Sequence, residues 1–138
     1  MPWLEFYTTL PASKIPIDFQ PKLAKVLYQV LPNKQLQRIC VHLVTDQNIY
    51  TGTDPDNNQP KAYGVLRTIG GVTLEDNRRT MPVLADHVQQ ELGISPQEFR
   101  MFFTDLPKDM YGVNGKIFHD LLIEGKEQFF GNQTETKP

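Results

Sequence analysis

The proline at position 2 carries a group that could do acid–base chemistry. If the initiator methionine is removed, as is common before a small second residue, Pro2 becomes a secondary amine at the head of an apolar segment. An α-amino group titrates at about pH 8 in water, and burial beside a positive charge disfavours its protonated form. Such an amine would be neutral at about pH 7 and could accept a proton. The alternative is that Pro2 only begins a strand, where proline is tolerated.

The cysteine and histidine side chains suggest less chemistry. Cys40 is the only cysteine, so it can form neither an internal disulfide nor a CxxC pair, and zinc and dithiol redox sites are disfavoured. The three histidines, His42, His87 and His119, have no metal-ligand partners at useful spacing. We therefore expect no metal and no cofactor, and we expect structural or surface roles for the histidines.

Length and charge narrow the class of protein. A chain of 138 residues is predicted to form a single domain, and its formal net charge is −2 without a cluster of basic residues. Nucleic acids and acidic membranes are therefore unlikely partners. The N-terminus lacks a basic region followed by an apolar one, and no apolar stretch approaches the roughly 20 residues that span a bilayer. These features predict a soluble, cytoplasmic protein.

Hydrophobic periodicity predicts two consecutive β-α-β units. Strands are expected over residues 2–8, 39–44, 62–69 and 99–104, with a further short edge strand over 48–52. A first helix is expected after Asp18 as its N-cap, and a second after a capping box formed by Thr73 and Asp76. Gly93 ends the second helix, and Pro82 is expected to kink it.

These elements predict an α+β fold in which two right-handed β-α-β units form a four-stranded sheet with both helices on one face. The other face of the sheet is then bare. Because the strands read as apolar on both sides, we expect a second copy of the chain to cover it, and closed homo-oligomers are the usual solution.

Five stretches, taken in their order and spacing, resemble the family of macrophage migration inhibitory factor and D-dopachrome tautomerase, within the tautomerase superfamily. They are MPWLEFYTTLP, the Lys34 loop before ICVHLV, AYGVLRTIGGVTLEDNRR, LGISPQEFR and GVNGKIF. The resemblance covers residues 1–118 and implies one domain over that range. It also implies a homotrimer of β-α-β-β-α-β subunits whose sheets surround a central channel.

Residues 119–138 extend past the usual end of the family. The apolar side chains of this extension are expected to pack across a subunit boundary and to stabilise the trimer, whereas the end from residue 131 onward is expected to be disordered. The apolar residues are Leu121, Leu122, Ile123, Phe129 and Phe130.

The resemblance also implies a reaction and its residues. Pro2 would be the general base of a cofactor-free keto–enol tautomerase acting on phenylpyruvate-like or dopachrome-like substrates. Lys34 would lower the pKa of that amine and bind a substrate carboxylate or the enolate oxygen. Ile69 would offer a backbone amide and a wall of the pocket, and Phe118 would close the pocket. Apart from the resemblance, Arg38 lies in the loop beside Lys34 and could reinforce the positive charge; the alternative is that it is a surface arginine.

The rim of the implied pocket departs from the vertebrate pattern. Arg100 replaces a tyrosine and Phe102 replaces an asparagine, both supplied by the neighbouring subunit, while Tyr111 and Val113 stand in place of valine and tryptophan. Arg100 could bind a carboxylate through two hydrogen bonds, which would favour a small aromatic α-keto acid over its ester. The alternative is that Arg100 is a solvated charge at the edge of a strand.

Two functions therefore stay open. The chain is expected to be a tautomerase with an additional cytokine-like signalling role, or else primarily a secreted, cytokine-like receptor-binding protein with vestigial catalysis. The second would need a cell-surface receptor and secretion without a signal peptide. A dehalogenase or decarboxylase of the wider superfamily is less favoured, because the added catalytic groups are not identifiable. Thiol–disulfide exchange is not expected, because the CxxC region of some members here reads Pro60-Lys61-Ala62-Tyr63.

Overall fold

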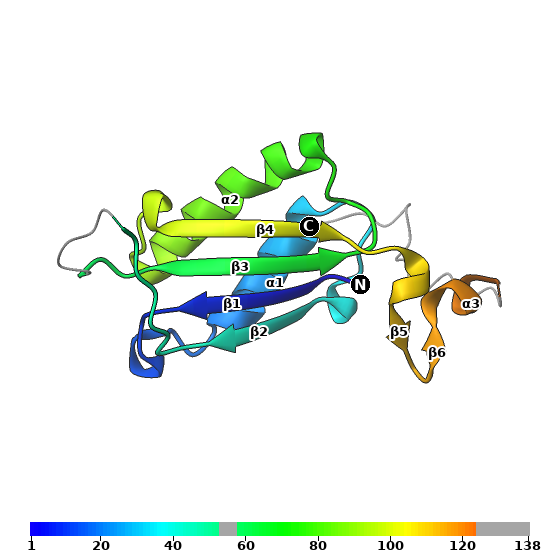
Figure 1. The fold of residues 1–138 in the computed structure, drawn as a ribbon, viewed down its shortest axis with the longest axis horizontal. Coiled ribbons are helices and arrows are strands. Elements are labelled where there is room, and N and C mark those ends of the chain that lie inside the picture. Colours follow the sequence, from blue (N-terminus) through cyan, green and yellow to red (C-terminus); the bar gives the residue numbers. More distant parts are fainter. Residues whose placement is uncertain (53–57, 124–138) are drawn as a thin grey trace.

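The structure, a computed structural model, describes residues 1–52 and 58–123, and four strands in it form one mixed sheet with the order β2-β1-β3-β4 (Figure 1). β1 and β2 pair in parallel, as do β3 and β4, whereas β1 and β3 are antiparallel. Each half is therefore a β-α-β unit, which confirms the predicted fold class. The strands are β1 (Trp3–Thr8), β2 (Cys40–Val44), β3 (Ala62–Thr68) and β4 (Phe99–Asp105).

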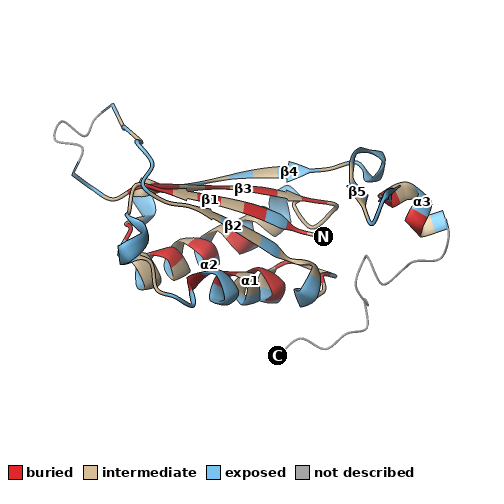
Figure 2. Cartoon of the chain, turned by 90° about the horizontal axis from the view of Figure 1, so that it is seen from below, coloured by how far each residue is buried: buried red, intermediate tan, exposed pale blue. Residues whose placement is uncertain are grey.

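Two long helices, α1 (Phe19–Val30) and α2 (Leu74–Leu92), cover one face of the sheet (Figure 2). Their apolar sides and the inward-facing strand residues form one core, which includes Leu4, Phe6, Leu27, Leu66 and Leu84. The core fixes the sheet, and the sheet ends then fix the loops that carry the candidate site. Short 3-10 helices occupy Ala12–Lys14, Leu36–Arg38, Pro96–Glu98 and Lys108–Met110.

The predicted boundaries of α2 are confirmed. Thr73 and Asp76 form the capping box, in which the Asp76 backbone N–H donates to the Thr73 hydroxyl at 3.1 Å. Gly93 follows the helix in the left-handed region at φ 68°, which glycine adopts without steric cost. The helix continues without a break past Pro82, which is exposed.

Asp18 is the N-cap residue of α1, as predicted, but its side chain makes no capping hydrogen bond and instead lies 3.2 Å from the Lys22 ammonium. The predicted edge strand is wrong, because residues 48–52 form no strand, although the structure describes them. A strand needs a neighbour that accepts and donates the ladder hydrogen bonds, and sequence propensity does not supply one.

The face of the sheet opposite the helices is only partly apolar, which corrects the expectation of two apolar faces. Glu5 and Arg67 form an ion pair there, and the Tyr7 hydroxyl donates a hydrogen bond of 2.5 Å to Glu5. The Tyr7 and Tyr63 rings stack with their centroids 4.6 Å apart. This mixed face is left uncovered by the helices of the chain (Figure 2).

A small C-terminal unit follows β4 and was not predicted. It consists of the hairpin β5 (Gly112–Val113) and β6 (Lys116–Ile117) and the short helix α3 (Phe118–Ile123) (Figure 1). An Asn-Gly turn joins β5 and β6 with φ values of 56° and 75°, and this dipeptide is a recognised hairpin signal.

Helix α3 contains the first part of the apolar extension. Leu121 is buried, Leu122 is half-buried and Ile123 is exposed. The expectation that Phe129 and Phe130 dock lies outside the described residues, as does the expectation about the end of the chain. Within residues 1–52 and 58–123, no helix is both long and apolar enough to cross a membrane.

A buried lysine stabilises the end of the sheet where β1 ends and β3 begins, which is called the far end below. Lys61 is 1% exposed, and its ammonium lies 3.0 Å from a Glu98 carboxylate oxygen. Its carbonyl oxygen accepts from the Thr8 hydroxyl at 2.9 Å and from the Thr9 backbone N–H at 3.0 Å. Lys61 therefore joins the end of β1 to the start of β3 and to the turn before β4.

We predict that Lys61→Met destabilises the chain by about 2–3 kcal/mol, because it leaves a partly buried Glu98 carboxylate without its counter-charge. The double variant Lys61→Met/Glu98→Gln should recover most of that loss. Lys22→Met, which removes an exposed ion pair with Glu91, is the control and should not change stability measurably. Urea unfolding measures all three, and equal stability of Lys61→Met and Lys22→Met would contradict the prediction.

Candidate functional site

The N-terminus lies at one end of the sheet, beside the end of β3 (Figure 1). Pro2 is buried, and its carbonyl oxygen accepts a hydrogen bond of 3.0 Å from the Cys40 backbone N–H at the start of β2. The pairing of Trp3 with Cys40 continues this ladder. The position of the first residues is therefore set by the sheet, which is what a fixed N-terminal base would need.

Lys34 reaches the same end of the sheet from the loop between α1 and β2. Lys34 is only 6% exposed, and its ammonium donates a hydrogen bond of 2.6 Å to the carbonyl oxygen of Ile69. Asn33, directly before it, adopts a left-handed φ of 56°. A buried charge is tolerated where hydrogen bonds replace water. The structure thus brings together Lys34 and Ile69, two residues that the family resemblance assigns to one site.

Electrostatics link this lysine to the N-terminal amine. The pKa of the Met1 α-amino group is lowered from 8.0 to about 5, first by burial and then by the positive charges of Lys34 and Arg38. The nearby Cys40 opposes this shift. An amine at this position is therefore neutral at about pH 7 and able to accept a proton. Removal of Met1 would give Pro2 the free amine at the same end of the sheet.

Tyr111 connects the C-terminal unit to the same residues. Burial raises the pKa of its phenol, with a further contribution from Cys40, whereas Arg38 opposes the rise. Its ring packs edge-to-face on Phe118, with the centroids 5.6 Å apart, and the Phe118 backbone N–H donates to its carbonyl oxygen at 2.8 Å. In the single chain Phe118 has no exposed surface, so it supports Tyr111 from behind. Val113, in β5, is half-buried.

Arg100 and Phe102 do not join these residues within one chain. Arg100 lies opposite Tyr63 in β3, whereas Thr104 lies opposite Arg67, the partner of Trp3. Four residues of strand, about 13 Å, therefore separate Arg100 from the level of the N-terminus. Arg100 and Phe102 instead border a cavity of about 320 Å³ at the far end of the sheet, together with Ile49, Lys61, Ala62 and Tyr63.

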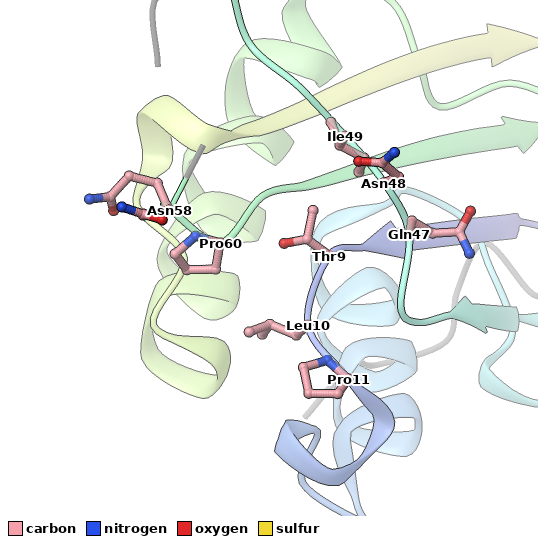
Figure 3. A pocket seen from close by; sticks show the side chains of 9 residues that line it. Thr9, Leu10, Pro11, Gln47, Asn48, Ile49, Asn58 and Pro60 are labelled. Atoms are coloured by element: carbon pink, nitrogen blue, oxygen red, sulfur yellow. The ribbon is translucent and has the colours of Figure 1, made fainter. Parts of the chain in front are cut away.

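A second cavity lies at that far end and contains none of the predicted site residues. Its volume is about 350 Å³, and its walls include Thr9, Leu10 and Pro11 after β1 (Figure 3). The other residues that line it are Gln47, Asn48, Ile49, Asn58, Gln59 and Pro60. Its lining residues carry no ionisable side chain. It is therefore unsuited to proton transfer and distinct from the site around Pro2.

Sequence reasoning missed Asp105 and Lys61, whose contacts lie far apart in the sequence. The Asp105 carboxylate accepts a hydrogen bond of 2.9 Å from the Gly70 backbone N–H, beside Ile69. The two adjacent glycines after β3 indicate a turn, but they do not identify the residue that accepts its hydrogen bond. In residues 1–52 and 58–123, no three His, Cys, Asp or Glu side chains are grouped so as to hold a metal ion.

We predict that Lys34→Ala raises the pKa of the N-terminal amine, because removal of a nearby positive charge favours the protonated form. The pKa should stay below about 8, because burial is the larger cause of the shift. NMR titration of an isotope-labelled N-terminus measures it. Lys22→Ala, an exposed lysine on α1, is the control and should leave the value unchanged; an unchanged value in Lys34→Ala would disprove the coupling.

Known proteins are similar to this chain in both sequence and fold. A family model described as macrophage migration inhibitory factor (MIF) matches residues 1–119. The homologue from Trichinella spiralis is 31% identical over 118 residues, which is 86% of this chain and 100% of that protein. The factor from Mus musculus is 31% identical over 119 residues, or 86% and 99% of the two chains. The solved Trichinella spiralis structure gives a TM-score of 0.76 at 31% identity and covers 83% of this chain and 97% of its own. The chain belongs to the macrophage migration inhibitory factor family.

Proposed function

We propose that this protein is a cofactor-free keto–enol tautomerase whose general base is the amine of Pro2 after removal of Met1. The observation that carries the proposal is the lowered pKa of the Met1 α-amino group, which burial and the charges of Lys34 and Arg38 keep neutral at about pH 7. Removal of Met1 would place the Pro2 amine next to the same charges. Membership of the family supports a MIF-like role, as a tautomerase or a cytokine. The specific substrate and the assignment of the base belong to the proposal.

The reaction moves one proton between carbon and oxygen. The Pro2 nitrogen accepts a proton from the carbon next to the substrate carbonyl, and the electrons of that C–H bond form the C=C bond while the carbonyl electrons move to oxygen. Lys34 stabilises the enolate oxygen as its charge develops. An ammonium has three N–H donors, so the substrate oxygen can share Lys34 with Ile69. Return of the proton from Pro2 to the oxygen gives the enol.

The preferred substrate is a small aromatic α-keto acid of the phenylpyruvate type, with dopachrome-like compounds as the second class. Arg38, beside the amine, supplies a positive charge for the substrate carboxylate. Tyr111 and Val113 would form the lip, with Phe118 supporting it. Arg100 and Phe102 would complete the pocket from a neighbouring copy, because within one chain both border the cavity at the other end of the sheet.

We propose a homotrimer, because the pocket needs residues from a neighbouring copy and because one face of the sheet is left uncovered. The face opposite the helices carries aromatic side chains such as Trp3, Tyr7 and Phe102, of which Phe102 is 55% exposed. Neighbouring copies would cover these rings, while Glu5 and Arg67 would line the central channel. No nucleic acid and no membrane is proposed as a partner.

The second candidate function is that of a cytokine-like protein, secreted without a signal peptide, that binds a cell-surface receptor and retains only vestigial catalysis. The similarity to the Mus musculus factor favours it. The two candidates differ in the role of Pro2. A tautomerase needs the free amine for turnover, whereas receptor binding needs only the surface around it.

We predict that Pro2→Gly lowers kcat/KM for the α-keto acid on the order of 10²-fold, as expected for loss of a positioned general base. A retained methionine or an N-terminal tag should have a similar effect while leaving the oligomer intact. Mass spectrometry of the N-terminus and size-exclusion chromatography with light scattering are the controls. Full activity of a protein with a verified blocked N-terminus would refute Pro2 as the base.

We predict that Arg100→Ala weakens turnover of the free α-keto acid much more than that of its methyl ester, because only the acid presents a carboxylate to the guanidinium. Arg38→Ala should show the same preference. Lys25→Ala, an exposed charge on α1, should change neither substrate. Comparable losses on acid and ester would show that the arginines act through structure or through their general field.

A further inference from the structure

We propose that Asp105 is a positioning residue: its carboxylate fixes the turn over residues 69–71 and, through the Ile69 carbonyl, the ammonium of Lys34. The proposal rests on the role of Lys34 in the proposed function. Asp105 lies at the end of β4, is exposed and is part of none of the predicted sites. Its importance comes from a short series of contacts that ends at the lysine.

The turn after β3 has little stiffness of its own. Gly70 and Gly71 both adopt left-handed backbone conformations, with φ values of 73° and 82°. Two adjacent glycines offer no side chains to restrict the backbone, so the conformation must be imposed by outside contacts. The Gly70 backbone N–H donates to a carboxylate oxygen of Asp105 at 2.9 Å.

The carboxylate itself is placed by the sheet. Asp105 is the last residue of β4 and lies opposite Thr68, the last residue of β3. The next backbone N–H, of Leu106, donates to the Thr68 carbonyl oxygen at 2.8 Å. The end of the parallel ladder therefore fixes Asp105, and Asp105 reaches forward to hold Gly70, two residues beyond Thr68.

The turn contacts Lys34 at two points. The Ile69 carbonyl oxygen accepts from the Lys34 ammonium at 2.6 Å. A Cβ added to Gly71 would lie 3.6 Å from Cε of Lys34 and 3.3 Å from Cδ of Pro32, so the turn packs against the lysine stem and the loop that carries it. Any shift of the turn therefore changes both the acceptor of the ammonium and the wall along its side chain.

Three variants separate this role from a general charge effect. Asp105→Ala removes the acceptor, whereas Asp105→Asn keeps an oxygen acceptor and removes only the charge. Asp86→Ala, at an exposed position on α2, is the matched control for loss of a surface carboxylate. Each is made in the processed wild-type chain and in a Lys34→Ala background, and thermal melting confirms that each is folded.

The measurements are kcat/KM for the α-keto acid and, by NMR, the pKa of the N-terminal amine. Asp105→Ala should lower kcat/KM about fivefold, which corresponds to about 1 kcal/mol for one hydrogen bond. Asp105→Asn should stay within about twofold of wild type, since the acceptor is retained. The pKa of the amine should rise in Asp105→Ala, because the Lys34 ammonium, whose charge lowers this pKa, is then no longer fixed by the turn. In the Lys34→Ala background Asp105→Ala should have no further effect on either quantity, because contacts that act through one group are not additive.

Wild-type behaviour of Asp105→Ala, or the same loss with and without Lys34, would overturn the proposal. Equal losses in Asp105→Ala and Asp105→Asn would also overturn it, because charge and not the hydrogen bond would then be responsible. If the wild-type chain lacks tautomerase activity, the proposed function fails by itself. The pKa of the amine then still tests the link between Asp105 and Lys34, so the two failures are distinguishable.

Discussion

A positive charge buried next to a backbone carbonyl is the constraint around which this end of the molecule is organised. The ammonium of Lys34 has exchanged water for the Ile69 carbonyl oxygen at 2.6 Å, and leaving such a charge unpaired would cost several kcal/mol. That requirement fixes the loop after α1 against the turn after β3, although the two are 35 residues apart. The same charge also helps to keep the neighbouring amine unprotonated.

The sheet separates the chemistry of one chain into two ends. The amine, Lys34 and Arg38 gather where β1 and β2 begin, whereas Arg100 and Phe102 border a cavity at the other end, which Lys61 also lines. The core determines this separation, because the four strands cannot slide without moving their apolar residues off the helices. A complete pocket of the proposed kind therefore needs two copies of the chain, each supplying a different end.

The sequence was sufficient for features that depend on local pattern, and insufficient for features that depend on a distant partner. The strands, the capping box at Thr73 and the helix end at Gly93 follow from periodicity and backbone preference. Residues 48–52 have strand-like composition but no neighbouring strand to pair with. The Asp18 carboxylate forms an ion pair with Lys22 and makes no capping hydrogen bond to the helix N-terminus. The hydrogen bond between Asp105 and Gly70 joins residues 35 positions apart. Local sequence patterns do not predict a contact between residues so far apart.

The antiparallel pairing of β1 with β3 gives the two β-α-β halves an approximate twofold relationship. Each half starts with a central strand, one at Trp3 and the other at Ala62, and these starts lie at opposite ends of the sheet. A polypeptide has only one beginning, however, so only the first of these ends can offer a terminal nitrogen. The corresponding place before β3 is taken by a peptide-bonded lysine with a carboxylate partner. Two equivalent halves thus become chemically unequal by connectivity alone, and an assembly of such chains has as many terminal amines as it has chains.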